Sequence, residues 1–375
     1  MSSSSASIVT EPKQVRLLVA ETQQPTARAA VRNGCCCLLT HEVRTAAGRG
    51  PQRASPTETP SVFGHLLASP STGLWLRVHD WPARGSGSEK GVIFLVHGFG
   101  EHMGRYEHVA IALSEAGYRV TGIDHQGHGG SEGDRTYVYA FEDYAVDLLA
   151  LVARVAAGYT AEQRAERSWF AIGNSMGGLI TTHAVLRGQR EPWRLGGIRW
   201  SGIVLSGALF RPDPAAATPL KVFLAGCLAG LCPKLGLDPI RPQLLSRDAA
   251  VVERAMNDPL MYAGKILIGS GNAMLVAMDE AMAAAAEFAP PVRLQFGTAD
   301  GIVQPQGSTD FHAACGSADK TLVRYEGLFH EVFNEPEKDR VIADVLGWID
   351  ERATPSAAGA TAGAAVPAAQ ATGEA

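Results

Sequence analysis

Two serines lie in Gly-x-Ser-x-Gly segments, a pattern that suits a nucleophilic hydroxyl group. Ser131 lies in segment 129–133 and Ser175 in segment 173–177. A serine nucleophile of this kind needs a strand directly before it and a helix directly after it. Ser131 comes seven residues after an apolar strand-like run, inside a polar Gly/His loop, whereas Ser175 sits directly between an apolar run and a helical pattern. We therefore predict that Ser175 is the nucleophile and that Ser131 is a loop residue.

A serine hydroxyl needs a general base to accept its proton. Sites built on a strand, a serine and a helix order their residues along the chain as nucleophile, acid and base. Three histidines follow Ser175. His183 lies on the helix that starts at the serine, and His312 lies in a helical pattern. His330 comes just after the last predicted strand, and we predict that it is the base.

The base in turn needs a carboxylate that orients it and stabilises its charged form. Asp300 comes just after a predicted strand, in the segment GTADGIV. Asp310 belongs to the following helical pattern, and Asp319 precedes a strand rather than following one. We predict that Asp300 is this carboxylate; the alternative is that it only forms the turn before Gly301.

The reaction also needs two N–H donors that bind the oxyanion. One donor is expected to be the amide of Met176, the residue after the nucleophile. The other is expected in the loop 97–100 (HGFG), where Gly98 and Gly100 allow the backbone to turn its amides inward. We predict that the amide of Phe99 is the second donor.

These residues need a sheet that brings strand ends together. The predicted strands are 74–81, 92–96, 119–124, 168–173, 202–206, 292–296 and 321–325. The predicted helices are 108–115, 141–156, 177–187 and 336–349. Short, almost wholly apolar strands that alternate with helices predict an α/β fold with a doubly wound, mostly parallel sheet. Catalytic groups of such sheets gather at the carboxyl ends of the strands.

One interval interrupts this alternation. Residues 210–288, here called the insertion, contain no segment that we predict to be a strand. The apolar run 222–232 has 11 residues, too few to cross a membrane, which takes about 20. We predict that the insertion forms a helical cap, or lid, and that Cys227 and Cys232 are small buried residues in it. The catalytic domain is then expected at 56–209 and 289–352.

The two ends of the chain differ in composition from this core. Residues 1–55 are rich in Ser, Thr, Ala and Arg, with seven basic and three acidic residues, which fits an organelle transit peptide or a plain disordered leader. Acylation of Cys35–Cys37 is a further alternative. Residues 353–375 form an Ala/Gly/Pro-rich segment that we predict to be a disordered tail.

Composition excludes several classes of protein. Hydrophobic residues make up 46% of the 375 residues and charged residues 19%, so the chain is able to form a sizeable core and is not mainly disordered. Six cysteines are too few for a small disulfide scaffold. The net charge of −5 argues against general nucleic-acid binding.

Over residues 60–350 the chain resembles the α/β-hydrolases of the monoacylglycerol lipase group. The segments that carry the resemblance are 97–106 (HGFGEHMGRY), 124–133 (DHQGHGGSEG), 173–178 (GNSMGG), 257–260 (NDPL), 297–303 (GTADGIV) and 330–335 (HEVFNE). The resemblance implies a Ser175–Asp300–His330 triad and an oxyanion hole formed by the amides of Phe99 and Met176. Asn174 departs from the group, whose better-known members carry His there.

The same resemblance implies roles for other polar residues. Glu101 and Arg105 are expected to form a structural ion pair or a loop anchor. His125 and His128 are expected to be loop hydrogen-bonding groups.

The function that the resemblance implies is hydrolysis of monoacylglycerol-like esters to glycerol and a fatty acid through an acyl-enzyme. No metal or organic cofactor is required. The alternatives are a lysophospholipase, an esterase for phenolic (caffeoyl-type) esters and a non-catalytic ligand receptor. The expected partner is a lipid ester, with peripheral contact between the insertion and a membrane or lipid droplet. A cytoplasmic or peripheral membrane location follows, or a chloroplast or other organelle if 1–55 is a transit peptide.

Overall fold

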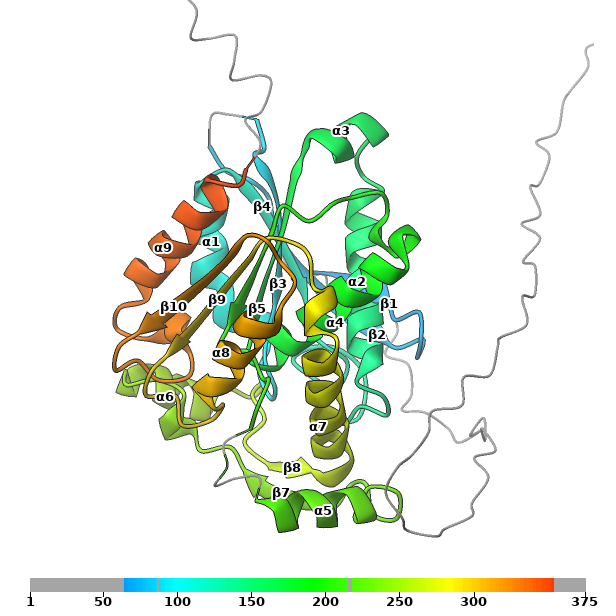
Figure 1. Cartoon of the computed structure of the whole chain (residues 1–375), viewed down its shortest axis with the longest axis vertical. Coiled ribbons are helices and arrows are strands. Elements are labelled where there is room, and N and C mark those ends of the chain that lie inside the picture. The colour runs from blue at the N-terminus through cyan, green and yellow to red at the C-terminus, as the bar shows by residue number, and fades with distance from the viewer. Residues whose placement is uncertain (1–63, 86–87, 213, 215–217, 354–375) are drawn as a thin grey trace, which may run out of the picture. The chain divides into compact units, whose positions relative to one another are not determined.

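The structure of the chain is a computed structural model that describes residues 64–85, 88–212, 214 and 218–353 (Figure 1). The predicted leader 1–55 lies outside the described residues, as does the predicted tail apart from Ala353. All of the described residues belong to one compact unit, Arg53–Ala375.

The centre of this unit is an eight-stranded sheet. Its strands are β1 (Gly64–Ala68), β2 (Trp75–Trp81), β3 (Gly91–Val96), β4 (Tyr118–Ile123), β5 (Ser168–Asn174), β6 (Gly202–Ser206), β9 (Val292–Gly297) and β10 (Lys320–Tyr325). They lie in the order β1-β2-β4-β3-β5-β6-β9-β10. The six strands β4, β3, β5, β6, β9 and β10 are parallel to one another. The strands β1 and β2 are antiparallel to their neighbours. The predicted mostly parallel sheet is confirmed.

The seven predicted strands are all present, but β1 was not predicted. It is a five-residue edge strand that pairs only with β2. Leu67 is buried while Leu66 next to it is 42% exposed. One buried side chain among the three residues of β1 whose burial is described gives no periodic pattern that identifies a strand.

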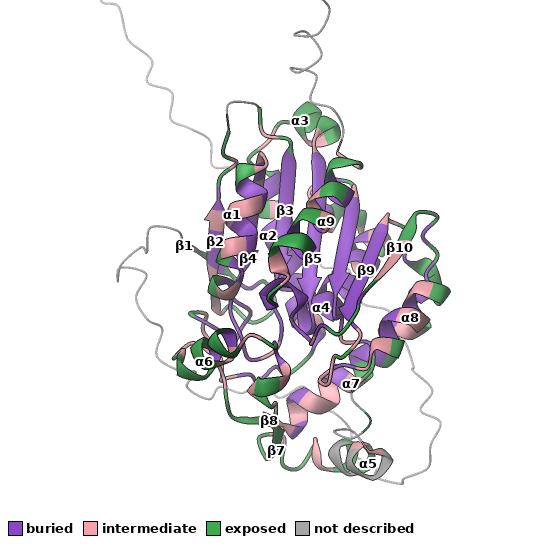
Figure 2. Cartoon of the chain, turned by 90° about the vertical axis from the view of Figure 1, so that its left-hand side faces the viewer, coloured by how far each residue is buried: buried purple, intermediate pink, exposed green. Residues whose placement is uncertain are grey.

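Helices cover both faces of the sheet (Figures 1 and 2). The helices outside the insertion are α1 (Glu107–Glu115), α2 (Glu142–Ala156), α3 (Ala161–Glu166), α4 (Met176–Arg190), α8 (Pro305–Ala314) and α9 (Lys338–Asp350). Short 3-10 helices are η1 (Met103–Tyr106), η2 (Pro192–Leu195), η3 (Pro242–Leu244), η4 (Ala285–Glu287) and η5 (Val332–Asn334). The four predicted helices are present; α3 was not predicted because it buries no side chain.

Alternate residues of each central strand serve two separate cores. Phe94 of β3 belongs to the core under α2 and α4, whereas Ile93 and Leu95 belong to the core under α1 and α9. Every residue of β3 and β5 is buried, as the purple strands of Figure 2 show. Burial on both faces explains why these strands are almost continuously apolar.

The insertion leaves the sheet after β6 and returns at β9, two strands that are neighbours in the sheet. It contains α5 (Pro219–Leu228), β7 (Gly236–Pro239), α6 (Ala249–Asn257), β8 (Lys265–Leu267) and α7 (Ile268–Ala283). The expectation of no strand here is wrong, because β7 and β8 pair as a small antiparallel sheet. Strands of four and three residues that include Gly, Pro and Lys lack the apolar pattern that predicts a strand.

None of the described side chains in the apolar run of the insertion is buried in a core. Cys227 and Cys232, predicted to be buried, are exposed. Phe223 is 66% and Leu231 80% exposed. The prediction of burial fails because no described element covers this side of α5. Within the part of the chain that the structure describes, no helix is both long and apolar enough to span a membrane.

A buried acid on α2 makes the stability of the fold depend on pH. Asp147 is fully buried, and burial raises the pKa of its carboxyl group to about 7. In an unfolded chain the same group ionises near pH 4. The folded state therefore binds more protons than the unfolded state between these values, and its stability falls as the pH rises from about 4 to 7.

We predict that Asp147→Asn stabilises the fold more at about pH 8 than at about pH 5, because it removes the cost of ionising a buried carboxyl group. The measurement is the difference in melting temperature between variant and wild type across this range. Asp339→Asn, at an exposed position of α9, is the control and is expected to show no such trend. A difference for Asp147→Asn that is constant with pH would contradict the assignment.

Candidate active site

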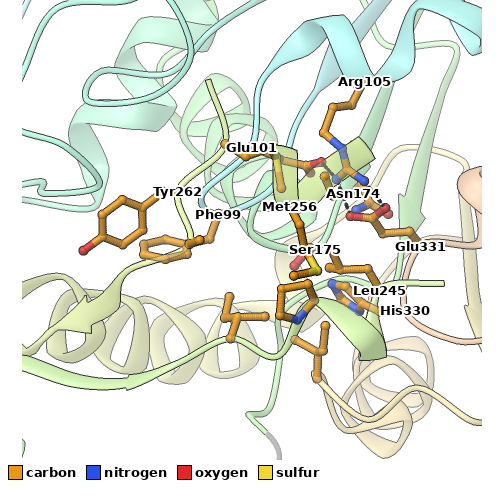
Figure 3. A pocket seen from close by; sticks show the side chains of 16 residues that line it. Phe99, Glu101, Arg105, Asn174, Ser175, Leu245, Met256, Tyr262, His330 and Glu331 are labelled. Atoms are coloured by element: carbon orange, nitrogen blue, oxygen red, sulfur yellow. Dashed lines mark hydrogen bonds and ion pairs between the residues drawn. The ribbon is translucent and has the colours of Figure 1, made fainter. Parts of the chain in front are cut away.

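Ser175 lies between the last residue of β5 and the first residue of α4. Its backbone has φ 55° and ψ −121°, a conformation that residues with a side chain rarely adopt and that stores strain. Its carbonyl accepts hydrogen bonds of 3.0 Å from the amides of Gly178 and Leu209. Its side chain lines the pocket shown in Figure 3. Strand, strained serine and helix thus follow one another as the sequence predicts.

The glycines around Ser175 allow backbones to touch. A Cβ atom on Gly177 would lie 2.1 Å from the carbonyl oxygen of Val96, at the end of β3. A Cβ atom on Gly173 would lie 2.4 Å from the carbonyl oxygen of Gly177. No side chain fits at either distance, so the Gly-x-Ser-x-Gly spacing is a steric requirement of the turn.

Ser131 lies in a loop, as predicted. Its hydroxyl donates to the carbonyl oxygen of Asp124 at 2.5 Å and accepts from the amide of Arg77 at 2.8 Å. Both hydrogen bonds connect the loop to the adjoining strands, and Ser131 does not line the pocket that contains Ser175.

His330 and Asp300 come together behind this pocket. Nδ1 of His330 lies 2.7 Å from Oδ2 of Asp300. The other carboxylate oxygen of Asp300 accepts from the amides of Ile302 and Val303 at 2.8 and 3.0 Å. These bonds fix the carboxylate, which fixes the imidazole. His330 lines the same pocket as Ser175 (Figure 3).

The other two histidines after Ser175 lie elsewhere. His183, on α4, has Nε2 2.9 Å from the carbonyl oxygen of Ala277. His312 lies on α8. Neither lines the pocket with Ser175, so the structure brings only His330 of the three to that serine's pocket.

The surroundings of His330 favour its charged form. Burial of the ring disfavours the imidazolium, but the negative charge and hydrogen bond of Asp300 outweigh burial, and Glu331 and Glu101 add to them. The pKa of His330 is therefore raised above its ordinary value of 6.5. A base with a raised pKa accepts a proton from a serine hydroxyl more readily.

The two amides predicted to bind an oxyanion belong to a residue next to the serine and to a loop of the same pocket. Met176 is the first residue of α4, and Phe99 lies in the loop after β3 and lines the pocket. Among the described residues, neither amide has a hydrogen-bond acceptor. The neighbouring amide of Gly98 is different, because it donates to Oε1 of Glu101 at 2.5 Å.

A buried ion cluster joins the loops that carry Phe99 and His330. Nη1 of Arg105 lies 2.7 Å from Oε2 of Glu101, as the predicted ion pair requires. The guanidinium also binds both carboxylate oxygens of Glu331, at 2.5 and 2.7 Å. Glu331 was not predictable as a partner of Arg105, because the two residues lie 226 positions apart in the sequence.

Two carboxyl groups share one guanidinium in this cluster. Burial raises the pKa of Glu101, and the charge of Glu331 adds to that rise although Arg105 opposes it. The hydroxyl of Tyr106 also donates to Oε1 of Glu101 at 2.7 Å. The cluster therefore has no uncompensated positive charge.

The histidines of the neighbouring loops hydrogen-bond the backbone, as predicted. Nε2 of His125 lies 3.1 Å from the carbonyl oxygen of His97, and Nδ1 of His128 lies 3.0 Å from that of Gln126. Burial lowers the pKa of His125 to about 3 and that of His128 to about 4. Both rings are neutral near pH 7 and hold the loops in place.

Most of the pocket wall is apolar, and half of its sixteen lining residues come from the insertion. The apolar lining residues are Phe99, Ile240, Pro242, Leu245, Ala255, Met256, Met261, Tyr262, Ala263 and Ile302. The insertion is hydrogen-bonded to the site loops, for example from the amide of Tyr262 to the carbonyl oxygen of Gly100 at 2.7 Å. Apart from Phe99, sequence reasoning did not identify these wall residues, because their apolar pattern is that of ordinary packing.

No group of three or more His, Cys, Asp or Glu side chains within the described ranges is arranged to hold a metal ion. The geometry brings together a strained serine, a buried imidazole–carboxylate pair and two amides that have no acceptor among the described residues.

Comparison with known proteins agrees with this geometry. A family model described as serine aminopeptidase, S33, matches residues 87–337. The chain is 33% identical to the monoacylglycerol lipase of Mycolicibacterium smegmatis, over 69% of this chain and 88% of that protein. It is 32% identical to the monoglyceride lipase of Homo sapiens, over 84% of this chain and 99% of that protein.

Solved structures show the same fold. The crystal structure of the monoacylglycerol lipase of Paleococcus ferrophilus matches with a TM-score of 0.62 and 28% identity, over 74% of this chain and 99% of that one. The chain therefore belongs to the serine aminopeptidase S33 family of α/β-hydrolases and is a homologue of the monoacylglycerol lipases.

Proposed function

We propose that this hydrolase cleaves monoacylglycerols to glycerol and a fatty acid, with Ser175, His330 and Asp300 as its catalytic triad. The observation that carries the proposal is the convergence of Ser175 in its strained turn with the His330–Asp300 pair at one largely apolar pocket. The substrate class is supported by the monoacylglycerol lipases to which the chain is about one-third identical.

The geometry supports a two-step reaction. The hydroxyl oxygen of Ser175 attacks the ester carbonyl, and its proton passes to Nε2 of His330, because Nδ1 is held by Asp300. The amides of Phe99 and Met176 bind the oxyanion. The intermediate then collapses, the ester C–O bond breaks and glycerol leaves with the proton from His330. Water, activated by the same imidazole, hydrolyses the acyl-serine and releases the fatty acid.

The insertion provides the wall for the acyl chain in this proposal. Leu245, Met256 and Met261 all line the pocket, and their apolar side chains suit a hydrocarbon tail. In this proposal the catalytic domain carries out the reaction, and the insertion selects the substrate. The insertion thus has the role of a lid.

The outer surface of the insertion suits contact with a lipid interface. Phe223, Leu231 and Leu235 are 66%, 80% and 55% exposed along the segment from α5 to β7. A group of exposed apolar side chains often marks an interaction surface, whereas single exposed apolar side chains are common and need no explanation. We propose that this surface docks on the membrane or droplet that holds the substrate.

The substrate class is tested with a panel of esters. We expect kcat/KM for 2-monooleoylglycerol to exceed that for an oleoyl lysophospholipid and a caffeoyl ester by about tenfold or more, as a site built for one alcohol allows. A preference for either other ester would replace the proposed substrate class. Tight binding of a ligand without turnover would instead favour a receptor.

The raised pKa of His330 predicts the acid side of the pH profile. The imidazole must be neutral to accept the serine proton, so kcat/KM is expected to fall about tenfold per pH unit below that pKa. Glu331→Gln removes one of the charges that raise it, and the acid limb is expected to move to lower pH.

The control for this shift is Glu326→Gln, which changes an exposed charge on the same loop. Glu326 is not among the groups that raise the pKa of His330. The acid limb of the pH profile is therefore expected to stay in place in the Glu326→Gln variant. An acid limb that moves to higher pH in Glu331→Gln would contradict the role given to His330.

Docking through the insertion is tested with Leu231→Asp. Loss of one buried leucine from an interface is expected to weaken vesicle binding roughly tenfold, while hydrolysis of a water-soluble ester is unchanged. Trp193→Asp, at a 71% exposed apolar residue outside the insertion, is the control. Equal vesicle binding by wild type and Leu231→Asp in flotation would refute docking by this surface.

A further inference from the structure

Asn174, the last residue of β5, has an unusual environment for a polar side chain. The residue is only 2% exposed. Neither Oδ1 nor Nδ2 has a hydrogen-bond partner among the residues that the structure describes. Burying an amide without partners is unfavourable, and protein interiors rarely leave one in that state. An amide without a described partner, directly before the nucleophile, is therefore a candidate to bind a ligand.

Asn174 is one of the residues that line the polar end of the pocket. Figure 3 shows Arg105, Asn174 and Glu331 grouped on one side of Ser175, with Phe99 and Tyr262 on the other. An ester bound at Ser175 has two arms, the acyl chain and the alcohol. The apolar side suits the acyl chain, so the polar side is left for the alcohol.

Asn174 differs from its charged neighbours in being free to bind. Both oxygens of Glu331 and one oxygen of Glu101 already accept from Arg105. Glu331 also accepts from Nδ2 of Asn334 at 3.0 Å. The guanidinium of Arg105 is shared between two carboxyl groups, so it offers no free positive charge to a phosphate or carboxylate. The amide, in contrast, offers one donor group and one acceptor, which together match a hydroxyl group.

We propose that Asn174 is a specificity-determining residue that hydrogen-bonds the leaving alcohol, and that this end of the pocket selects uncharged, hydroxyl-bearing alcohols over anionic ones. The proposal rests on the proposed ester hydrolase function and deepens it. It places the selectivity for the alcohol in the residue at which this chain departs from the better-known members of its group.

The test compares two esters with the same acyl chain, 1-monododecanoylglycerol and ethyl dodecanoate. Only the first has free hydroxyl groups on its alcohol. In Asn174→Leu, which keeps the size of the side chain but not its hydrogen bonds, kcat/KM for the glycerol ester is expected to fall about tenfold or more. For the ethyl ester it is expected to change less than about threefold.

Ser206→Ala is the matched control. Ser206 pairs in register with Asn174 on the next strand. Its buried hydroxyl also has no partner within the described part of the chain, but Ser206 does not line the pocket. Its loss is expected to leave the ratio of the two esters unchanged. Asn174→Ala is the second variant in case the leucine disturbs the turn, and labelling of Ser175 by a fluorophosphonate reports whether the turn is intact in each.

The possible results separate the two proposals. An equal loss on both esters, or no loss on either, would overturn the role of Asn174 and leave ester hydrolysis standing. Wild-type protein that hydrolyses neither ester would overturn ester hydrolysis, and the role of Asn174 with it. Wild-type kcat/KM for dodecanoyl lysophosphatidic acid is expected at least about tenfold below that for the glycerol ester. Equal values would overturn the selection against anionic alcohols.

Discussion

The site depends on one steric constraint, the start of α4 directly against the backbone end of β3. A Cβ atom on Gly177 would lie 2.1 Å from the carbonyl oxygen of Val96, so only glycine allows this approach. The contact forces the chain to turn within one residue, which leaves Ser175 at φ 55°. It also places the amide of Met176 at the start of a helix, where the helix dipole favours negative charge. Position, strain and local potential at the serine therefore follow from one contact.

The buried Arg105 cluster extends this order to the rest of the site. Glu101 accepts from the amide of Gly98 beside Phe99, and Glu331 directly follows His330. Arg105 binds both carboxyl groups, so the loop proposed to bind the oxyanion and the loop that carries the proposed base share one anchor. Breaking such a buried pair from one side typically costs about 3–5 kcal/mol. The cluster also raises the pKa of His330, so the same charges that hold the loops tune the imidazole.

The sequence predicted those parts of the fold that follow from local pattern. The buried strands are continuous apolar runs, and the turn at Ser175 has a fixed spacing of small residues. Parts that depend on distant partners were not predictable: Glu331 finds Arg105 only in the folded chain, and β7 and β8 are too short to show a period. The exposure of Cys227 and Cys232 was missed for the opposite reason, because an apolar run normally indicates burial. The sequence showed Asn174 as a departure from the group that the chain resembles. It did not show that the buried side chain has no described hydrogen-bond partner.

The central claim is that Ser175 becomes acylated during turnover, and it is tested most directly by mass spectrometry. The protein is quenched during hydrolysis of a slowly deacylated ester, digested, and searched for the acyl group. The account predicts that the one acylated peptide is the peptide that contains Ser175. When the His330→Gln variant is acylated with an activated ester, the adduct is expected to last longer than in the wild type, because deacylation is slower. Acylation of the peptide with Ser131, or turnover with no acyl adduct on Ser175, would contradict the account.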